Sequence, residues 1–123
     1  MFSTMGDLFR KGIEEFNTRS FFEAHDTWEE LWSGTSGPDR LFYQGLIQTA
    51  VGLYHMTNGN IRGARSQFGK ALDKLERYLP AYHGIDTGYL VQGVRACLAS
   101  VGNGGAESVV RPDPPPAPKI RMS

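Results

Sequence analysis

The segment from Leu41 to Met56 constrains the fold more than any other part of the chain, because apolar residues cover nearly its whole circumference at helical spacing. A helix that is apolar on almost every side is normally buried by other elements on every side. No residue between Leu41 and Ile61 is charged, but glutamines, asparagines and a histidine make the segment too polar to span a bilayer. We therefore expect residues 38–57 to form a central core helix, with no membrane as partner.

Amphipathic patterns elsewhere in the chain predict four further helices around this one. Their expected ranges are residues 4–17, 21–32, 61–79 and 87–101. Gly45 and Gly52 lie inside the central helix, where glycine costs about 1 kcal/mol relative to alanine, and this predicts that a neighbouring helix packs closely there. The expected fold class is all-α, an antiparallel helical bundle of about five helices with a buried third helix at its centre.

Polar residues at the predicted helix starts indicate the caps. Ser20 and Glu23 are three residues apart, which matches the capping box at the start of a helix. Asn60 and Asp86 are expected to cap the two later helices. Such side chains satisfy backbone N–H groups that have no partner within the helix, so they predict where each helix begins.

A change in composition marks the end of the bundle after Val101. Five of the seven prolines lie between Pro112 and Pro118, and apolar residues become sparse. We expect two regions, a helical bundle domain over residues 1–101 and a Pro-rich disordered tail over residues 102–123. Such a tail should add little stability to the fold.

The charge balance limits the kinds of partner. The 123 residues include 13 basic and 13 acidic side chains, whereas nucleic acids and anionic membranes select clustered Lys and Arg, so no nucleic-acid partner is expected. Cys97 is the single cysteine and excludes an internal disulfide, which fits a reducing compartment. The N-terminal residues have no long apolar core and predict no signal peptide, so we expect a cytoplasmic protein.

The segment FFEAHDTWEELW, residues 21–32, carries the sharpest chemical feature of the chain. At about 100° per residue, His25 lies on one stripe with both tryptophans, and Glu29 flanks that stripe. Thr27 and the other acidic residues of the segment should face solvent, whereas both tryptophans should lie in the core. A histidine with a carboxylate one turn later can serve in proton transfer or in ligand binding.

A short turn at residues 33–37 makes this helix an antiparallel neighbour of the central helix. Side chains at equal distance from the turn should then lie side by side, which brings the polar residues of both helices together. The predicted inward-facing polar cluster consists of His25, Glu29, Arg40, Gln44 and Gln48. It is either a buried hydrogen-bond network, in which each unpaired group would cost about 1–3 kcal/mol, or a pocket in which His25 and Glu29 act on a ligand.

The same residues offer a poor metal site. His25 and Glu29 are four residues apart and could share one ion. The central helix adds only glutamines and His55, which should lie about 10 Å beyond the neighbours of His25 at 1.5 Å per residue. We therefore predict no metal and no cofactor. Cys97 lies in an apolar helix and is expected to be a buried structural thiol rather than a nucleophile.

Three blocks of the sequence carry a resemblance to a known family. They are FFEAHDTWEELW at residues 21–32, QGLIQ at residues 44–48, and the pairs Gly59-Asn60 and Gly63-Ala64. With these blocks in this order, over roughly residues 9–79, the chain resembles the domain-of-unknown-function 309 family of small helical proteins from bacteria and archaea. The resemblance implies an antiparallel helical bundle and no established activity.

Two classes of function follow from the sequence. The first is a non-enzymatic helical module that binds a protein partner or forms a homo-oligomer, through aromatic surface from Phe22, Tyr43 or Tyr89. The alternative is a protein or enzyme that binds a small ligand at the polar cluster, with or without a metal ion. We expect the first class, and the sequence leaves open whether the chain is an enzyme.

Overall fold

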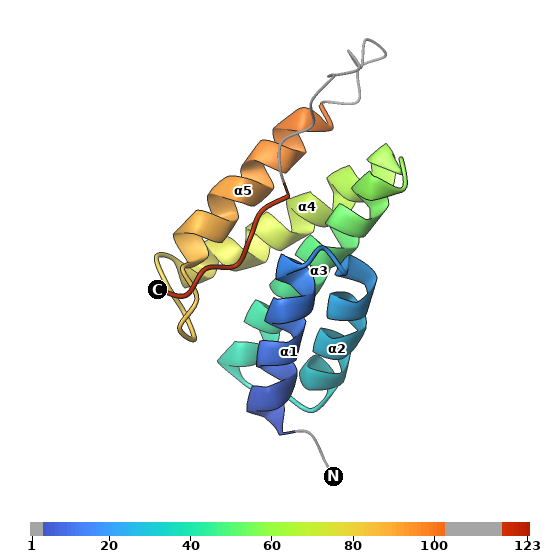
Figure 1. The fold of residues 1–123 in the computed structure, drawn as a ribbon. Coiled ribbons are helices and arrows are strands. Elements are labelled where there is room, and N and C mark those ends of the chain that lie inside the picture. Colours follow the sequence, from blue (N-terminus) through green and yellow to red (C-terminus); the bar gives the residue numbers. More distant parts are fainter. Residues whose placement is uncertain (1–3, 103–116) are drawn as a thin grey trace.

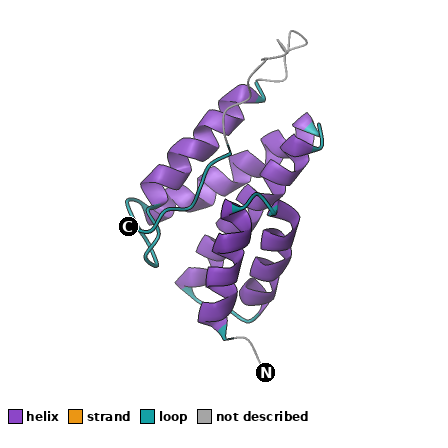
Figure 2. Cartoon of the chain, in the orientation of Figure 1, coloured by secondary structure: helices purple, strands orange, loops and turns teal. Residues whose placement is uncertain are grey.

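The computed structural model describes residues 4–102 and 117–123. Over these residues the chain forms five α-helices and one short 3₁₀ turn, and no strand is present (Figure 1, Figure 2). The elements are α1 (Met5–Asn17), α2 (Phe21–Ser33), α3 (Pro38–Thr57), α4 (Ile61–Leu75), η1 (Glu76–Tyr78) and α5 (Thr87–Ser100). The predicted all-α class is confirmed, and β-type pairing in the described part is limited to two isolated bridges, Tyr82 with Ile85 and Ile85 with Met122.

The central helix of the bundle is α3. It packs against α2 on one side and α4 on the other, while α1 packs on α2 and α5 packs on α4 (Figure 1). Many of its side chains are buried, and Leu46, Ala50 and Leu53 are completely so. The prediction of a buried third helix at the centre is confirmed, and the helix has the predicted bounds.

Two glycines allow the close contact between α3 and α4, as predicted. A Cβ atom on Gly52 would lie 2.6 Å from the ring of Phe68, and one on Gly45 would lie 2.9 Å from a methyl carbon of Leu75. Both neighbours are completely buried, so these contacts belong to the middle of the core. A larger residue at either position would therefore push the two helices apart.

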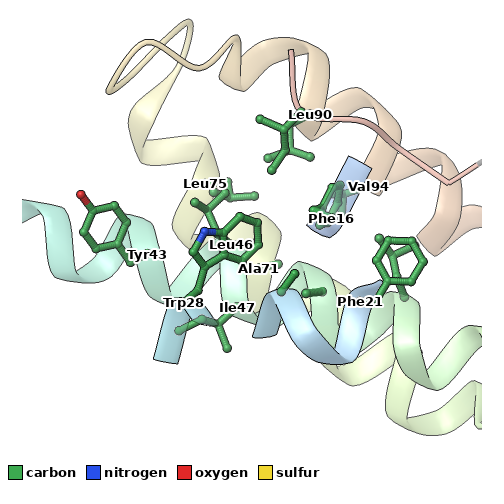
Figure 3. Packing of buried hydrophobic residues seen from close by; sticks show 14 of the residues in the cluster. Phe16, Phe21, Trp28, Tyr43, Leu46, Ile47, Ala71, Leu75, Leu90 and Val94 are labelled. Atoms are coloured by element: carbon green, nitrogen blue, oxygen red, sulfur yellow. The ribbon is translucent and has the colours of Figure 1, made fainter. Parts of the chain in front are cut away.

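Trp28 fills the space between α1 and α2 in the core (Figure 3). It is completely buried, and its Nε1–H donates to the backbone carbonyl of Phe9 at 3.3 Å. A Cβ atom on Gly12 would lie 2.0 Å from that nitrogen, so the glycine lets α1 lie directly against the indole. Trp32 is only partly buried. Of the two tryptophans that were expected in the core, Trp28 is therefore the one that is completely buried.

Three helix starts test the predicted caps. Asn60 and Asp86 each accept a hydrogen bond from a backbone N–H three residues later, as predicted. Ser20 makes no side-chain cap at the start of α2, so the predicted capping box there is wrong. Glu23 still lies in the first turn of α2, where a negative charge is favourable beside the helix dipole.

The helix α4 ends earlier than predicted. Its last residue is Leu75, and η1 and an extended Leu79 follow, where the periodicity predicted helix up to residue 79. Leu79 precedes Pro80, and a proline ring disfavours helical backbone at the residue before it. The chain then passes through a loop at residues 79–86 before α5 begins.

The end of the chain differs from the predicted tail. Residues 103–116, which make up most of that tail, lie outside the described residues, and the proposed domain boundary stays a prediction. Residues 117–123 lie against the bundle, where the side chain of Asn17 exchanges two hydrogen bonds with the backbone of Ile120 at 2.8 and 2.9 Å. Ile120 is only 4% exposed. These seven residues therefore pack on the bundle, where the sequence predicted a disordered tail. Only Ile120 and Met122 are apolar after the last proline, and two residues are too few to show a periodicity.

Cys97 on α5 is completely buried, as expected for a structural thiol, and burial raises its pKa to about 11.

Among the helices of the described part, none combines the length and the apolar character that a membrane crossing requires.

Candidate functional site

The inner face of α2 differs from the one that the sequence predicts. Its buried residues are Phe21, Ala24, Thr27, Trp28 and Leu31. The helix is thus rotated toward Thr27, which the pattern placed on the solvent side, and this rotation moves His25 and Glu29 to the edge of the buried face. The reason is that α2 packs against α1 as well as α3, so its buried stripe serves two neighbours instead of one.

His25 and Glu29 are brought together at this edge. Nε2 of His25 lies 3.3 Å from a carboxylate oxygen of Glu29, and the two side chains are 22% and 53% exposed. A surface pair four residues apart on a helix contributes about 0.3–0.5 kcal/mol when both groups are charged. Their spacing of four residues brings the two side chains together, but the carboxylate faces water, whereas the sequence predicted that it faces the interior.

His25 also lines a small apolar cleft between α2 and α3, with a volume of about 200 Å³. The walls of the cleft are Phe22, His25, Val51, Tyr54 and His55. The ring of Phe22 lies 5.5 Å from that of His25 and 5.4 Å from that of Tyr54. His25 thus lies beside residues about one to two turns further along α3 than Gln48, its predicted neighbour. His55, which the sequence placed too far away, lines the same cleft.

His55 is held in place by the start of α4. Its Nδ1 lies 3.3 Å from the side-chain amide nitrogen of Asn60. The oxygen of the same side-chain amide accepts from the backbone N–H of Gly63 and so caps α4. The orientation of the His55 ring is therefore tied to the turn between α3 and α4. Over residues 4–102 and 117–123, no three His, Cys, Asp or Glu side chains form a group that could hold a metal ion.

The other three residues of the predicted cluster make no hydrogen bond to His25 or Glu29 within the described part of the chain. Arg40 lies 3.8 Å above the ring of Trp32 and donates to the backbone carbonyls of Trp32 and Thr35 at 3.0 and 2.9 Å, so it closes the end of α2. Gln44 and Gln48 are partly buried, and Oε1 of Gln48 is buried without a partner among the described residues. That all five residues form one site stays a prediction.

Apolar side chains around the cleft are open to solvent. Phe22 is 50% exposed, and Tyr54 is also exposed. We call the surface formed by these two side chains and the other walls of the cleft the Phe22–Tyr54 face. Two exposed charged residues lie on the neighbouring elements: Glu23 follows Phe22 on α2, and Arg62 lies at the start of α4, which packs on α3.

A second and larger groove, of about 720 Å³, lies where α1, the start of α3, the loop at residues 79–86 and the end of the chain meet. At its polar centre, Asp39 accepts hydrogen bonds from the hydroxyl of Tyr82 and from Nε2 of His83, the latter at 2.9 Å. The hydroxyl of Tyr43 lies 3.4 Å from the same nitrogen. We call this region the Asp39–His83 groove.

Hydrogen bonds and burial set the protonation of these groups. The hydroxyl of Tyr82, and after it His83, lower the pKa of Asp39, so this carboxylate is ionised at neutral pH. The same hydrogen bond raises the pKa of Tyr82 to about 12, and burial raises the pKa of Tyr43. The polar group around Asp39 therefore combines this carboxylate with two hydroxyls that keep their protons, and Glu14 is a second carboxylate in the wall of the groove.

The sequence did not point to this group. Asp39 and His83 are 44 positions apart, and helical periodicity cannot bring a loop residue to the first turn of α3. The one available signal is local composition, because Tyr78, Tyr82 and His83 place three aromatic side chains with polar atoms around Pro80. A loop that only connects two helices does not need them.

Comparison with known proteins shows what the chain is similar to. Residues 9–67 match the model of a family described as Domain of unknown function (DUF309). The uncharacterized protein YpuF of Bacillus subtilis (strain 168) is 33% identical over 87 residues, which are 65% of this chain and 48% of that protein. An uncharacterized protein of Aquifex aeolicus (strain VF5) is 27% identical over 100 residues, 80% of this chain and 29% of that protein.

The chain spans about half of the first relative's length and less than a third of the second's. The family match covers the two sites to different extents. The segment matched by the family contains the whole Phe22–Tyr54 face, whereas Tyr82 and His83 of the groove lie after it.

Proposed function

We propose that this chain, whose residues 9–67 belong to the DUF309 family, is a non-enzymatic module that associates with a second copy of itself through the Phe22–Tyr54 face. The observation that carries the proposal is an open apolar cleft with exposed aromatic rings on its own rim. Exposed apolar side chains that are grouped, rather than scattered singly, mark interaction surfaces.

The face offers both halves of a symmetric contact. In a two-fold dimer the same surface of each copy lies against itself, so that surface must contain a projection and a recess. Phe22 is the projection, and the cleft beside it is the recess. Each Phe22 ring could enter the cleft of the other copy, where Tyr54 and the two histidine rings supply aromatic contacts.

Two charged residues of opposite sign suit the same arrangement. Glu23 is next to Phe22 on α2, and Arg62 lies at the start of α4, with α3 in contact with both helices. We also propose that a two-fold axis through the face pairs Glu23 of one copy with Arg62 of the other, twice. Opposite charges at the rim of an interface orient the partners and speed their association more than they raise the affinity.

The face is small, so the association should be weak. Stable interfaces bury about 800 Å² on each partner, which is more than a few exposed side chains around one cleft supply. A ligand site at the same place has less support, because ligand pockets usually occupy about 300–1,000 Å³ and this cleft has about 200 Å³. We place the module in the cytoplasm, since its single cysteine suits a reducing compartment.

Sedimentation velocity of the full chain over a wide range of concentrations tests the proposal. The mean mass should rise from monomer toward dimer, and Phe22→Glu should keep the chain monomeric, because the contact would bury an unpaired carboxylate. Met5→Glu is the matched control, since Met5 and Phe22 are both 50% exposed and Met5 lines the other groove. A monomer at every concentration, or an equal effect of both substitutions, would contradict the proposal.

Two charge reversals test whether the partner is a second copy in two-fold contact. Glu23→Arg and Arg62→Glu should each weaken self-association, because like charges would then face each other at both rims. Mixed in equal amounts, the two variants should associate again, since each supplies the charge that the other lacks. A mixture that stays monomeric while the unmodified chain dimerises would exclude the two-fold arrangement.

A further inference from the structure

The Asp39–His83 groove has the size and the lining of a small-molecule site. Its volume of about 720 Å³ falls within the range of about 300–1,000 Å³ that is usual for ligand pockets. The larger apolar side chains of its wall are Met5, Phe9, Ile13 and Met122. A mainly apolar wall with a few polar groups that fix orientation is typical of such sites.

Three rings form the aromatic part of this wall. The ring of Phe9 lies 5.6 Å from the rings of both Tyr43 and His83, and the last two rings lie 5.7 Å apart. The ring of Tyr43 is buried, but its hydroxyl points away from the packed core (Figure 3). Such rings can hold the apolar body of a ligand, and their faces also attract cations.

The charged groups of the groove leave an excess of negative charge. Arg10 lines the groove, but its positive charge is already matched by Asp7 at 2.6 Å. Nε2 of His83 lies 2.9 Å from Asp39, and this pair has no net charge when the histidine is protonated and one negative charge when it is neutral. Glu14 also lines the groove and makes no ion pair within the described residues. The excess is therefore negative in either protonation state of His83.

Both carboxylates of the groove can be reached by a ligand. Glu14 is exposed on α1, and the side chain of Asp39 is 36% exposed. One oxygen of Asp39 accepts from Tyr82 and the other from His83, whereas an ionised carboxylate has about four acceptor sites. An ammonium group has N–H donors and no acceptor, so it suits the sites of Asp39 that remain. Hydrogen bonds between two charged groups are stronger than neutral ones.

We propose that this groove binds a small organic cation, an ammonium group on an apolar or aromatic body. The ammonium group donates to Asp39 and is attracted by Glu14, while the body lies against the rings of Phe9 and Tyr43. Benzylamine, which is protonated at neutral pH, is the simplest probe of this class. The site is separate from the Phe22–Tyr54 face and does not depend on self-association.

Titration of the full chain with benzylamine, benzyl alcohol and benzoate, followed by ¹H–¹⁵N NMR, tests this site. The three probes share one ring and carry a positive, a neutral and a negative polar group. Benzylamine should give saturable shifts at amides around Phe9 and Asp39, and its affinity should fall as salt is added. Benzyl alcohol should bind at least about threefold more weakly, because it can replace the hydrogen bond but not the charge. Benzoate should bind more weakly still, because the carboxylates of the groove repel it.

Two substitutions test the two carboxylates. Asp39→Asn should weaken benzylamine binding by about tenfold, because it removes the acceptor of a charged hydrogen bond. Glu14→Gln should weaken it by about two- to threefold, as expected for an exposed charge. Glu30→Gln is the matched control for the change in net charge, because Glu30 is exposed on α2 and does not line the groove. This variant should bind benzylamine as the unmodified chain does.

Four results would each overturn the proposal. They are the absence of a saturable shift with benzylamine, binding of benzyl alcohol or benzoate as tight as that of benzylamine, unchanged affinity for benzylamine in Asp39→Asn, and equal affinities for benzylamine in Glu14→Gln and Glu30→Gln. The comparison of the three probes uses the unmodified chain, so it gives a decisive result even where a variant fails to fold.

Discussion

The Phe22–Tyr54 face and the Asp39–His83 groove are built in opposite ways. The face comes from α2 and α3, helices that follow one another and are joined by a short turn. The groove joins α1, the first turn of α3, the loop at residues 79–86 and Met122, so its residues span almost the whole chain. Consecutive helices can form the face alone, whereas the groove exists only when distant segments are in place.

This difference should appear in the stability of the two regions. Elements with few buried contacts open locally at a lower free energy than the core does. The loop at residues 79–86 buries only Ile85 and is otherwise held by two hydrogen bonds to Asp39 and by a few contacts with the end of the chain, whereas α2 and α3 bury many residues in the main core. The groove should therefore open before the helical hairpin does.

The largest expected effect would break the comparison by damaging both regions at once. Trp28 is completely buried and donates to the backbone of Phe9, which is also a wall of the groove. Trp28→Ala should lower the free energy of unfolding by about 3–5 kcal/mol, as measured by urea denaturation. Trp32→Ala removes a ring that is only partly buried and should cost clearly less, so equal costs would contradict the central position of Trp28.

The next effect should separate the two regions. Ile120→Ala removes a buried side chain from the end of the chain and should cost about 2–4 kcal/mol. Hydrogen exchange should rise most in the loop at residues 79–86, because the N–H of Asp86 donates to the carbonyl of Arg121 at 2.7 Å. Met122→Ala, at an exposed side chain, should change stability by no more than about 0.5 kcal/mol. An equal rise of exchange in α2 and α3 would show that the two regions open together.

The smallest effect concerns acid and sharpens the comparison at one carboxylate. Hydrogen bonds from Tyr82, and then from His83, hold the pKa of Asp39 below its ordinary value of 3.8, so folding favours the ionised form. This stabilisation is present above the ordinary pKa and is lost as the pH falls through the lower pKa of the folded state. When the pH is lowered below about 4, the melting temperature of the Asp39→Asn variant should therefore fall less than that of the unmodified chain.

The control for this acid effect is Asp73→Asn, which removes a carboxylate from an exposed pair with Arg77. This variant should follow the pH profile of the unmodified chain. Identical profiles for Asp39→Asn and the unmodified chain would mean that Asp39 holds the loop equally well in both of its protonation states.

Much of the helical framework could be predicted, because helix positions depend on spacing within one segment. The bounds of α3, its central place and its glycine contacts with α4 all follow from residues of α3 itself. The rotation of α2 toward Thr27 depends on two packing partners, and a rotation of this size was enough to move Glu29 from the interior to the surface. Periodicity within a single helix carries no information about the number of its neighbours.

The groove and the docked end of the chain were missed for a different reason. Asp39, Tyr82 and His83 meet through a loop that has no repeating pattern, and Ile120 is one of only two apolar residues after the last proline. A short turn constrains the register of consecutive helices to about one turn, but no comparable rule places a loop against a helix many residues away. The position of His25 beside α3 could therefore be predicted to within one or two turns, whereas the groove could not be predicted.

The thiol of Cys97 can report how often α5 leaves the bundle. Only the thiolate form of a cysteine reacts with alkylating reagents, and this one is completely buried with its pKa raised to about 11. It should react only during the intervals in which α5 detaches or the whole chain unfolds. Because the chain has a single cysteine, the labelling rate of one sulfur atom measures the frequency of those openings without any introduced probe.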